Sequence, residues 1–188
     1  MGFYFLGTAD FFALNVYSSR RVTHVDRSYD KAPSFSNDVQ ISGVYTPEWA
    51  VSSIEWLKYT PFAPRGVLNW IRHHYGDVPV IITENGYTDN NGSVDDTWRV
   101  TFLTEYINSA LQASMLDGCQ VKGYVVWSLL DNFEWLHGYT QKFGIFHVDF
   151  SHPNRTRTPK KSASHYAEII RNNGFPWPQR STINENIL

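Results

Sequence analysis

A glutamate ends an apolar run in the stretch VPVIITENGYTDNNG, which covers residues 78 to 92. A short β-branched run between a proline and an Asn/Gly-rich loop is typical of a strand that is buried on both faces. Glu84 lies where that strand is expected to end. A carboxylate at this place has either a structural role, as a cap or in an ion pair, or a role in catalysis. The rest of the sequence has to distinguish these two roles.

Polar and aromatic residues also follow the two other strands that the sequence predicts. Asn15 and Tyr17 end the first strand, and Trp127 ends the third. The loop after the third strand adds Asp131, Asn132, Glu134, Trp135, His137, Tyr139 and Phe143. Ligand sites in α/β proteins lie at the C-terminal ends of parallel strands. Carboxylates beside tryptophans suit a sugar, because its ring stacks on an indole and its hydroxyls donate hydrogen bonds to the carboxylate.

Each of these residues also has a structural interpretation when it is taken alone. Glu84 would most often be a capping or ion-paired carboxylate, Trp127 a core residue and Glu134 a solvated loop residue. Aromatic residues make up 16% of the chain, and they would serve a core as well as a sugar platform. The shared position of the set at one end of the predicted sheet favours chemistry over these separate structural roles.

Alternating strand and helix patterns would position these residues. Pro64 has the first-turn position of one helix, which Gly76 ends, and Gly118 suits the C-cap of a longer amphipathic helix. In chain order the sequence predicts a strand at 10–17, a loop to about 61, a helix from 64, a strand at 79–83, a helix from 98, a strand at 121–128, a loop at 129–158 and a helix from Pro159 to Gly174. This order indicates parallel strands with helices packed outside.

Three parallel strands leave both edges of a sheet with unpaired backbone groups. A closed (β/α)8 barrel typically needs about 250 residues, and this chain has 188. The sequence therefore predicts an α/β fold that is part of such a barrel. No linker divides the chain, so residues 1–177 are expected to form one unit, followed by a polar C-terminal tail at 178–188.

Composition excludes several classes of protein. A formal net charge of -2 argues against a nucleic-acid partner. Cys119 is the only cysteine, no Cys/His spacing predicts a metal site, and the adjacent His73 and His74 are interpreted as surface residues. No apolar run reaches the roughly 20 residues of a membrane span. The apolar N-terminus lacks a basic region and carries Asp10, so no signal peptide is expected in this chain, and the compartment stays open.

Five blocks of the chain resemble the retaining β-glycosidases of glycoside hydrolase family 1, the family of β-glucosidases, lactase and myrosinase-like enzymes. The blocks are GTADFFALNVYSSR at 7–20, ITENG at 82–86, GYVVWSLLDNFEW at 123–135, GYTQKFGIFHVDF at 138–150 and RTPKKSASHY at 157–166. In this order and spacing they are highly specific. The resemblance implies a (β/α)8 barrel of which residues 1–177 would be the C-terminal part, with the sixth, seventh and eighth strands.

The resemblance also implies a reaction, namely hydrolysis of terminal β-D-glycosides with retention of configuration and without a cofactor or metal ion. Glu84 would be the nucleophile, Tyr17 would donate a hydrogen bond to it, and Asn15 would lie beside them. A small glycoside would be the substrate. The residues implied in its binding are Trp127, against which the sugar would stack, Glu134 and Trp135, which would bind its outer hydroxyls, and Phe143, which would line the same pocket.

A second carboxyl group is absent from the pattern. Retaining glycosidases use two, about 5 to 5.5 Å apart, and the family's acid/base lies in an Asn-Glu-Pro motif that this chain lacks. The chain is therefore expected to require the N-terminal half of the barrel and to be inactive alone. Two other interpretations remain: a non-catalytic klotho-like relative that binds a sugar or a protein, against which the intact ITENG argues, and a structural fragment that folds only with a partner supplying the other strands.

Overall fold

A three-stranded parallel sheet forms the centre of the computed structural model, which describes residues 7–27 and 32–175. Its strands are β1 (Phe12–Asn15), β4 (Val80–Asn85) and β5 (Val121–Val126). They lie in the order β1-β4-β5, and both pairs are parallel. The predicted strands and their parallel arrangement are thus confirmed. The first strand is shorter than the predicted 10–17, because pairing with β4 covers only four of its residues.

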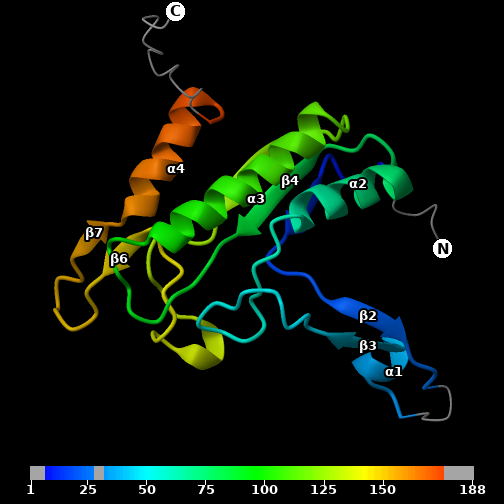
Figure 1. Cartoon of the computed structure of the whole chain (residues 1–188), viewed down its shortest axis with the longest axis horizontal. Coiled ribbons are helices and arrows are strands. Elements are labelled where there is room, and N and C mark those ends of the chain that lie inside the picture. Colours follow the sequence, from blue (N-terminus) through cyan, green and yellow to red (C-terminus); the bar gives the residue numbers. More distant parts are fainter. Residues whose placement is uncertain (1–6, 28–31, 176–188) are drawn as a thin grey trace, which may run out of the picture.

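Three long helices pack on one face of this sheet: α2 (Ala63–Tyr75), α3 (Thr97–Met115) and α4 (Lys161–Asn172). They lie side by side in that order, with α3 running along β4 (Figure 1). Leu68 and Ile71 of α2 and Ala110 of α3 form a buried core with Val80 and Ile82 of β4. Apolar residues at helical spacing therefore meet the apolar residues that alternate along the strands.

The opposite face of the sheet has no helix packed on it in the described part of the chain. Ala13, Asn15 and Val125 are exposed there, and Ile81 is half-buried. Val125 keeps 51% of its surface accessible to solvent. Strands β1 and β5 are the two edges, and each has β4 as its one partner in the described sheet. The described residues therefore form an α/β layer and not a closed barrel.

Some of the predicted helix ends are confirmed and others are wrong. Pro64 lies in the first turn of α2, and Gly76 ends it with a positive φ of 82°. Helix α3 ends at Met115 and is capped by Leu116, so the prediction that Gly118 caps it was wrong. Gly118 instead forms the following turn with φ of 75°. Helix α4 begins at Lys161 and not at Pro159, since Pro159 belongs to a strand.

Both long segments predicted as loops contain regular structure. The first holds an antiparallel hairpin of β2 (Arg21–His24) and β3 (Ile41–Val44), with the short helix α1 (Phe35–Val39) between them. The second holds a 3-10 turn at Trp135–His137 and a hairpin of β6 (Phe146–Val148) and β7 (Arg157–Pro159). All four residues of β2 are exposed. Without alternation between apolar and polar residues, these strands carry no periodic signal in the sequence.

Several smaller predictions can be compared with the structure. His73 and His74 are exposed, as expected, and Cys119 is buried. Within residues 7–27 and 32–175, no helix is long and apolar enough to cross a membrane, and no group of three or more His, Cys, Asp or Glu residues could hold a metal ion. The predicted tail at 178–188 lies outside the described residues.

Candidate active site

The strand ends bring the predicted residues to one edge of the sheet. Asn15 is the last residue of β1 and pairs with Glu84, near the end of β4, after a register shift between Leu14 and Asn15. Trp127 follows directly after β5, and its N–H donates to the carbonyl of Asn85 at 2.8 Å. Because the three strands are parallel, their C-terminal ends coincide. Glu84 lies on the middle strand of this edge.

Tyr17 and Glu84 make the central contact of the site. The Tyr17 hydroxyl donates a hydrogen bond to Glu84 Oε2 at 2.8 Å. Burial, and then the bond to the Glu84 carboxylate, raise the pKa of Tyr17 far above its ordinary value. Tyr17 therefore keeps its proton and remains a donor. Its ring is fixed by edge-on contacts with Trp56 and Phe143, at centroid distances of 5.9 and 6.4 Å.

Asn15 lies beside this pair with its side chain on the uncovered face of the sheet. Its Oδ1 accepts a hydrogen bond from Thr83 Oγ1 at 2.6 Å. Asn15 is exposed, so its amide remains open on the side away from the helices. The backbone N–H of Val16 donates to the carbonyl of Glu84 at 3.0 Å, which holds the ends of β1 and β4 together.

Trp127 and Glu134 form a second pair. The indole Nε1 of Trp127 donates to Glu134 Oε1 at 3.1 Å, and Glu134 keeps only 6% of its surface exposed. Burial raises the pKa of Glu134, the bond from Trp127 lowers it, and the negative charge of Glu84 raises it further. The pKa of Glu134 thus responds to the charge of Glu84, and the Trp127 indole holds Glu134 in place. Glu134 therefore borders the same space as Glu84, the nucleophile candidate.

Phe143 and Trp135 lie in different surroundings. Phe143 is 2% exposed and packs with Ile54 and Leu57, with Tyr17 and Trp127 on the border of this cluster. It thus forms a wall that joins the two pairs. Trp135 is 82% exposed in the 3-10 turn after Glu134. The structure brings Phe143 into the site and leaves the ring of Trp135 at its rim.

Local features that no sequence pattern indicated help to position the strand ends. A Cβ at Gly86 would lie 1.7 Å from the carbonyl oxygen of Trp127, so only glycine lets the two segments approach. Asn85 is fully buried and donates to the carbonyl of Val16 at 2.5 Å. It also accepts from the hydroxyl of Tyr124. Asn85 and Gly86 belong to the ITENG block, but their local pattern predicts a loop and does not indicate this close approach.

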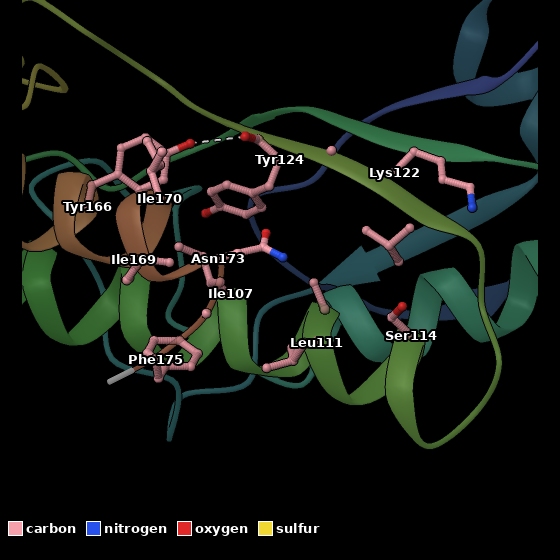
Figure 2. A pocket seen from close by; sticks show the side chains of 14 residues that line it. Ile107, Leu111, Ser114, Lys122, Tyr124, Tyr166, Ile169, Ile170, Asn173 and Phe175 are labelled. Carbon is pink, nitrogen blue, oxygen red and sulfur yellow. Dashed lines mark hydrogen bonds between the residues drawn. The ribbon is translucent and has the colours of Figure 1, made fainter. Parts of the chain in front are cut away.

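A groove of about 260 Å³ lies elsewhere, between α3, β5 and α4. Figure 2 shows Ile107 and Leu111 of α3 on one side and Tyr124 of β5 on the other, with Tyr166 donating to the Tyr124 carbonyl at 3.0 Å. No predicted site residue lines this groove. The candidate chemistry therefore belongs to the strand ends and not to this apolar space.

Comparison with known sequences identifies relatives of the chain. A family model described as Glycosyl hydrolase family 1 matches residues 4–175. Human lactase/phlorizin hydrolase is 47% identical over 169 residues, which are 90% of this chain and 9% of that protein. Myrosinase 1 of Brevicoryne brassicae is 41% identical over 165 residues, 87% of this chain and 35% of that protein. The guinea pig (Cavia porcellus) cytosolic beta-glucosidase is 39% identical over 174 residues, 92% and 36% of the two.

Solved structures give the same result. Aphid myrosinase superposes with a TM-score of 0.77 at 41% identity, over 88% of this chain and 35% of the other. A beta-glucosidase from Humicola insolens, solved in complex with glucose, superposes with a TM-score of 0.78 at 29% identity, over 88% and 36%. The chain thus spans between 9% and 36% of the length of these relatives. The family match over residues 4–175, with the shared fold, shows that the chain belongs to glycosyl hydrolase family 1.

Proposed function

We propose that this chain is the nucleophile-bearing part of a retaining β-glycosidase that hydrolyses terminal β-D-glycosides in carbohydrate metabolism. The observation that supports this most directly is the bond from Tyr17 to Glu84 at the C-terminal end of β4. The chain's relatives include beta-glucosidases. A carboxylate held by a protonated tyrosine, beside an indole and a second buried carboxylate, has the elements that a sugar site requires.

In this proposal Glu84 attacks the anomeric carbon of the glycoside. A bond forms between a Glu84 oxygen and that carbon, while the bond to the leaving oxygen breaks and the leaving oxygen receives a proton from a general acid. Water then attacks the same carbon, gives its proton to that acid's conjugate base, and releases Glu84 as a carboxylate. Tyr17 donates to one oxygen of Glu84, which orients the carboxylate for attack.

The remaining residues bind the sugar. The sugar face stacks on Trp127, and the buried oxygen atoms of Glu134 accept hydrogen bonds from its hydroxyls. The hydrogen bond from Trp127 Nε1 to Glu134 fixes the position of the indole relative to the carboxylate. Phe143 closes the apolar side of the pocket, and Trp135 at the rim binds outer hydroxyls. Asn15, which pairs with Glu84, binds the sugar beside it in this proposal.

The proposal assigns strands β1, β4 and β5 to the sixth, seventh and eighth positions of a (β/α)8 barrel. The unpartnered edges, the sheet face without helices and the partial coverage of the relatives support this. The general acid would come from the missing strands, because the chain has no Asn-Glu-Pro motif. The bond between Tyr17 and Glu84 favours catalysis over a klotho-like binding role, since binding alone does not need an oriented nucleophile.

The test is the variant Glu84→Ala in the complete protein that contains this chain. We expect hydrolysis of an aryl β-glucoside to fall on the order of 10⁴-fold or more, as for other nucleophile deletions. Azide should restore turnover, because it fits the space of the carboxylate and attacks the anomeric carbon, which gives the α-glycosyl azide. Full activity of the variant without azide would contradict the proposal. Glu48→Ala, at an exposed residue, is the control and should leave turnover unchanged.

A further inference from the structure

A buried ion pair lies behind the loop that follows β5. Lys160 Nζ donates to Asp131 Oδ1 at 2.9 Å, and neither side chain has any surface accessible to solvent. The pair joins this loop to the residue that precedes α4. Removing two charges from water is costly, so an interior pair that contributes little net stability can be kept for the geometry that it imposes.

Asp131 connects two segments of chain through its backbone and its side chain. Its Oδ1 also accepts from the N–H of Gly144 at 3.0 Å, and its own N–H donates to the carbonyl of Phe146 at 3.0 Å. A Cβ at Gly144 would lie 2.1 Å from the Asp131 nitrogen, so a glycine is required for this approach. Asp131 therefore fixes residues 128–132 against residues 143–146.

These two segments carry the residues to which sugar binding is assigned. Trp127 and Glu134 flank Asp131 in sequence, and Phe143 precedes Gly144. The N–H of Ser128 donates to the carbonyl of Phe143 at 3.1 Å, which continues the same contact. Glu84 and Tyr17 are held separately, by β4 and its pairing with β1. The ion pair thus acts on one side of the site only.

We propose that Asp131 and Lys160 are positioning residues that hold the sugar-binding wall, defined as Trp127, Glu134 and Phe143, at the correct distance from Glu84. This inference rests on the proposed function for its role in binding. Burial lowers the pKa of Lys160, and the Asp131 carboxylate opposes that change. His147 Nδ1 lies 3.4 Å from the other Asp131 oxygen, without a hydrogen bond between the two atoms.

The first test measures positioning without activity, on the complete protein that contains this chain. Asp131→Asn keeps the side-chain size and an oxygen for the Gly144 N–H but removes the charge opposite Lys160. Hydrogen exchange followed by mass spectrometry should become about tenfold faster in peptides that cover residues 127–146 and stay unchanged in the β4 peptide. Faster exchange throughout the chain, or no change at 127–146, would overturn the proposal.

The matched control is Asp117→Asn, which breaks the ion pair with Arg65. That pair has a nitrogen-to-oxygen distance of 2.6 Å, and Asp117 precedes β5, at the end of that strand opposite to Trp127. Its loss should speed exchange near α2 and the end of α3 and leave residues 127–146 unchanged. A control that also loosened residues 127–146 would show that the effect is not specific to Asp131.

The second test uses the complete protein and an aryl β-glucoside. A displaced wall should raise KM, and the inhibition constant of free glucose, about tenfold or more, because binding geometry is lost. A purely structural defect would reduce the fraction of active protein and leave both constants unchanged, which would overturn the proposal. Asp131→Asn combined with Lys160→Met should recover part of the loss, because no unpaired buried charge remains.

The two tests separate this proposal from the proposed function. Labelling of Glu84 in the unsubstituted protein, or azide rescue of Glu84→Ala, reports on the reaction. The exchange difference between Asp131→Asn and Asp117→Asn reports on positioning, even if the protein has no glycosidase activity.

Discussion

Tyr17 is the residue whose role follows most directly from its contacts. Its hydroxyl donates to Glu84 at 2.8 Å, and its ring is held by Trp56 and Phe143. The pKa of Tyr17 is raised by burial and by Glu84, so the hydroxyl stays protonated at neutral pH. The Tyr17 side chain is thus held in one position, and its hydroxyl remains a hydrogen-bond donor.

Tyr17→Phe should therefore lower kcat/KM without unfolding the protein. A hydrogen bond to a charged group contributes about 1.5 to 3 kcal/mol, which corresponds to a decrease of roughly 10-fold to 150-fold. The phenyl ring would keep its edge-on contacts with Trp56 and Phe143. Steady-state kinetics of the complete protein, together with its thermal midpoint, measure the two effects. Equal activity of variant and parent would remove Tyr17 from the catalytic account.

Glu134 gives a pH-dependent prediction at the same scale. Its pKa is raised mainly by burial, so folding disfavours the charged form of Glu134 relative to the unfolded chain. The stability that it contributes is complete below its ordinary pKa and is lost as the pH rises through the native value. Glu134→Gln should therefore raise the thermal midpoint at pH 7 more than at pH 4. A larger increase of the thermal midpoint at pH 4 than at pH 7 would contradict this prediction.

Among the helices and strands, the sequence predicts those with a periodic pattern of apolar residues or with residues that mark their ends. Helix α2, with Pro64 and Gly76 at its ends, and the strand that carries Glu84 were found from local pattern. The hairpin of β2 and β3 was missed because its residues are mostly exposed and do not alternate. The pair of Asp131 and Lys160 was missed because 29 positions separate two charged residues, each of which alone predicts a solvated surface.

The end of β4 approaches the end of β5 at Gly86, and this contact can be tested. In Gly86→Ala the new Cβ would meet the Trp127 carbonyl oxygen at 1.7 Å, so one segment has to move. We expect a loss of about 1 to 3 kcal/mol in the free energy of unfolding, with reduced activity because Glu84 and Trp127 separate. Urea unfolding and kinetics check both.

Gly66→Ala provides the control for this change. Gly66 lies within α2, and a Cβ there would meet nothing within 4 Å. The substitution should stabilise the protein by about 0.5 to 1 kcal/mol, since alanine favours a helix interior. If Gly86→Ala behaved like Gly66→Ala, the close approach of the two strand ends would not constrain the site.

In the molecule as a whole, the described residues form a sheet with helices packed on one face only. Helices cover one face of the sheet, and the other exposes Val125 together with both strand edges. Parallel sheets are normally buried on both faces. The sequence predicts an open sheet from its number of strands and its length, whereas nothing in the strand patterns themselves gives each strand a position within a barrel.

The isolated 188-residue chain should consequently be marginally stable and almost inactive. We expect binding of a hydrophobic dye, a shallow thermal transition and little turnover of an aryl β-glucoside, because the open face and the missing acid both remain. General acid catalysis alone is typically worth about 10² to 10⁴-fold. Circular dichroism, dye fluorescence and an activity assay measure these properties. Cooperative unfolding together with robust turnover would contradict the account of an incomplete barrel.

The proposed reaction depends on a covalent bond between the carboxylate of Glu84 and the sugar. The most direct measurement treats the complete protein with a 2-deoxy-2-fluoro-β-glucoside that carries a good leaving group, and then maps the trapped glycosyl group by peptide mass spectrometry. We expect one label, on Glu84 in the ITENG segment. A label on any other residue, or an active protein in which Glu84 is never modified, would contradict it.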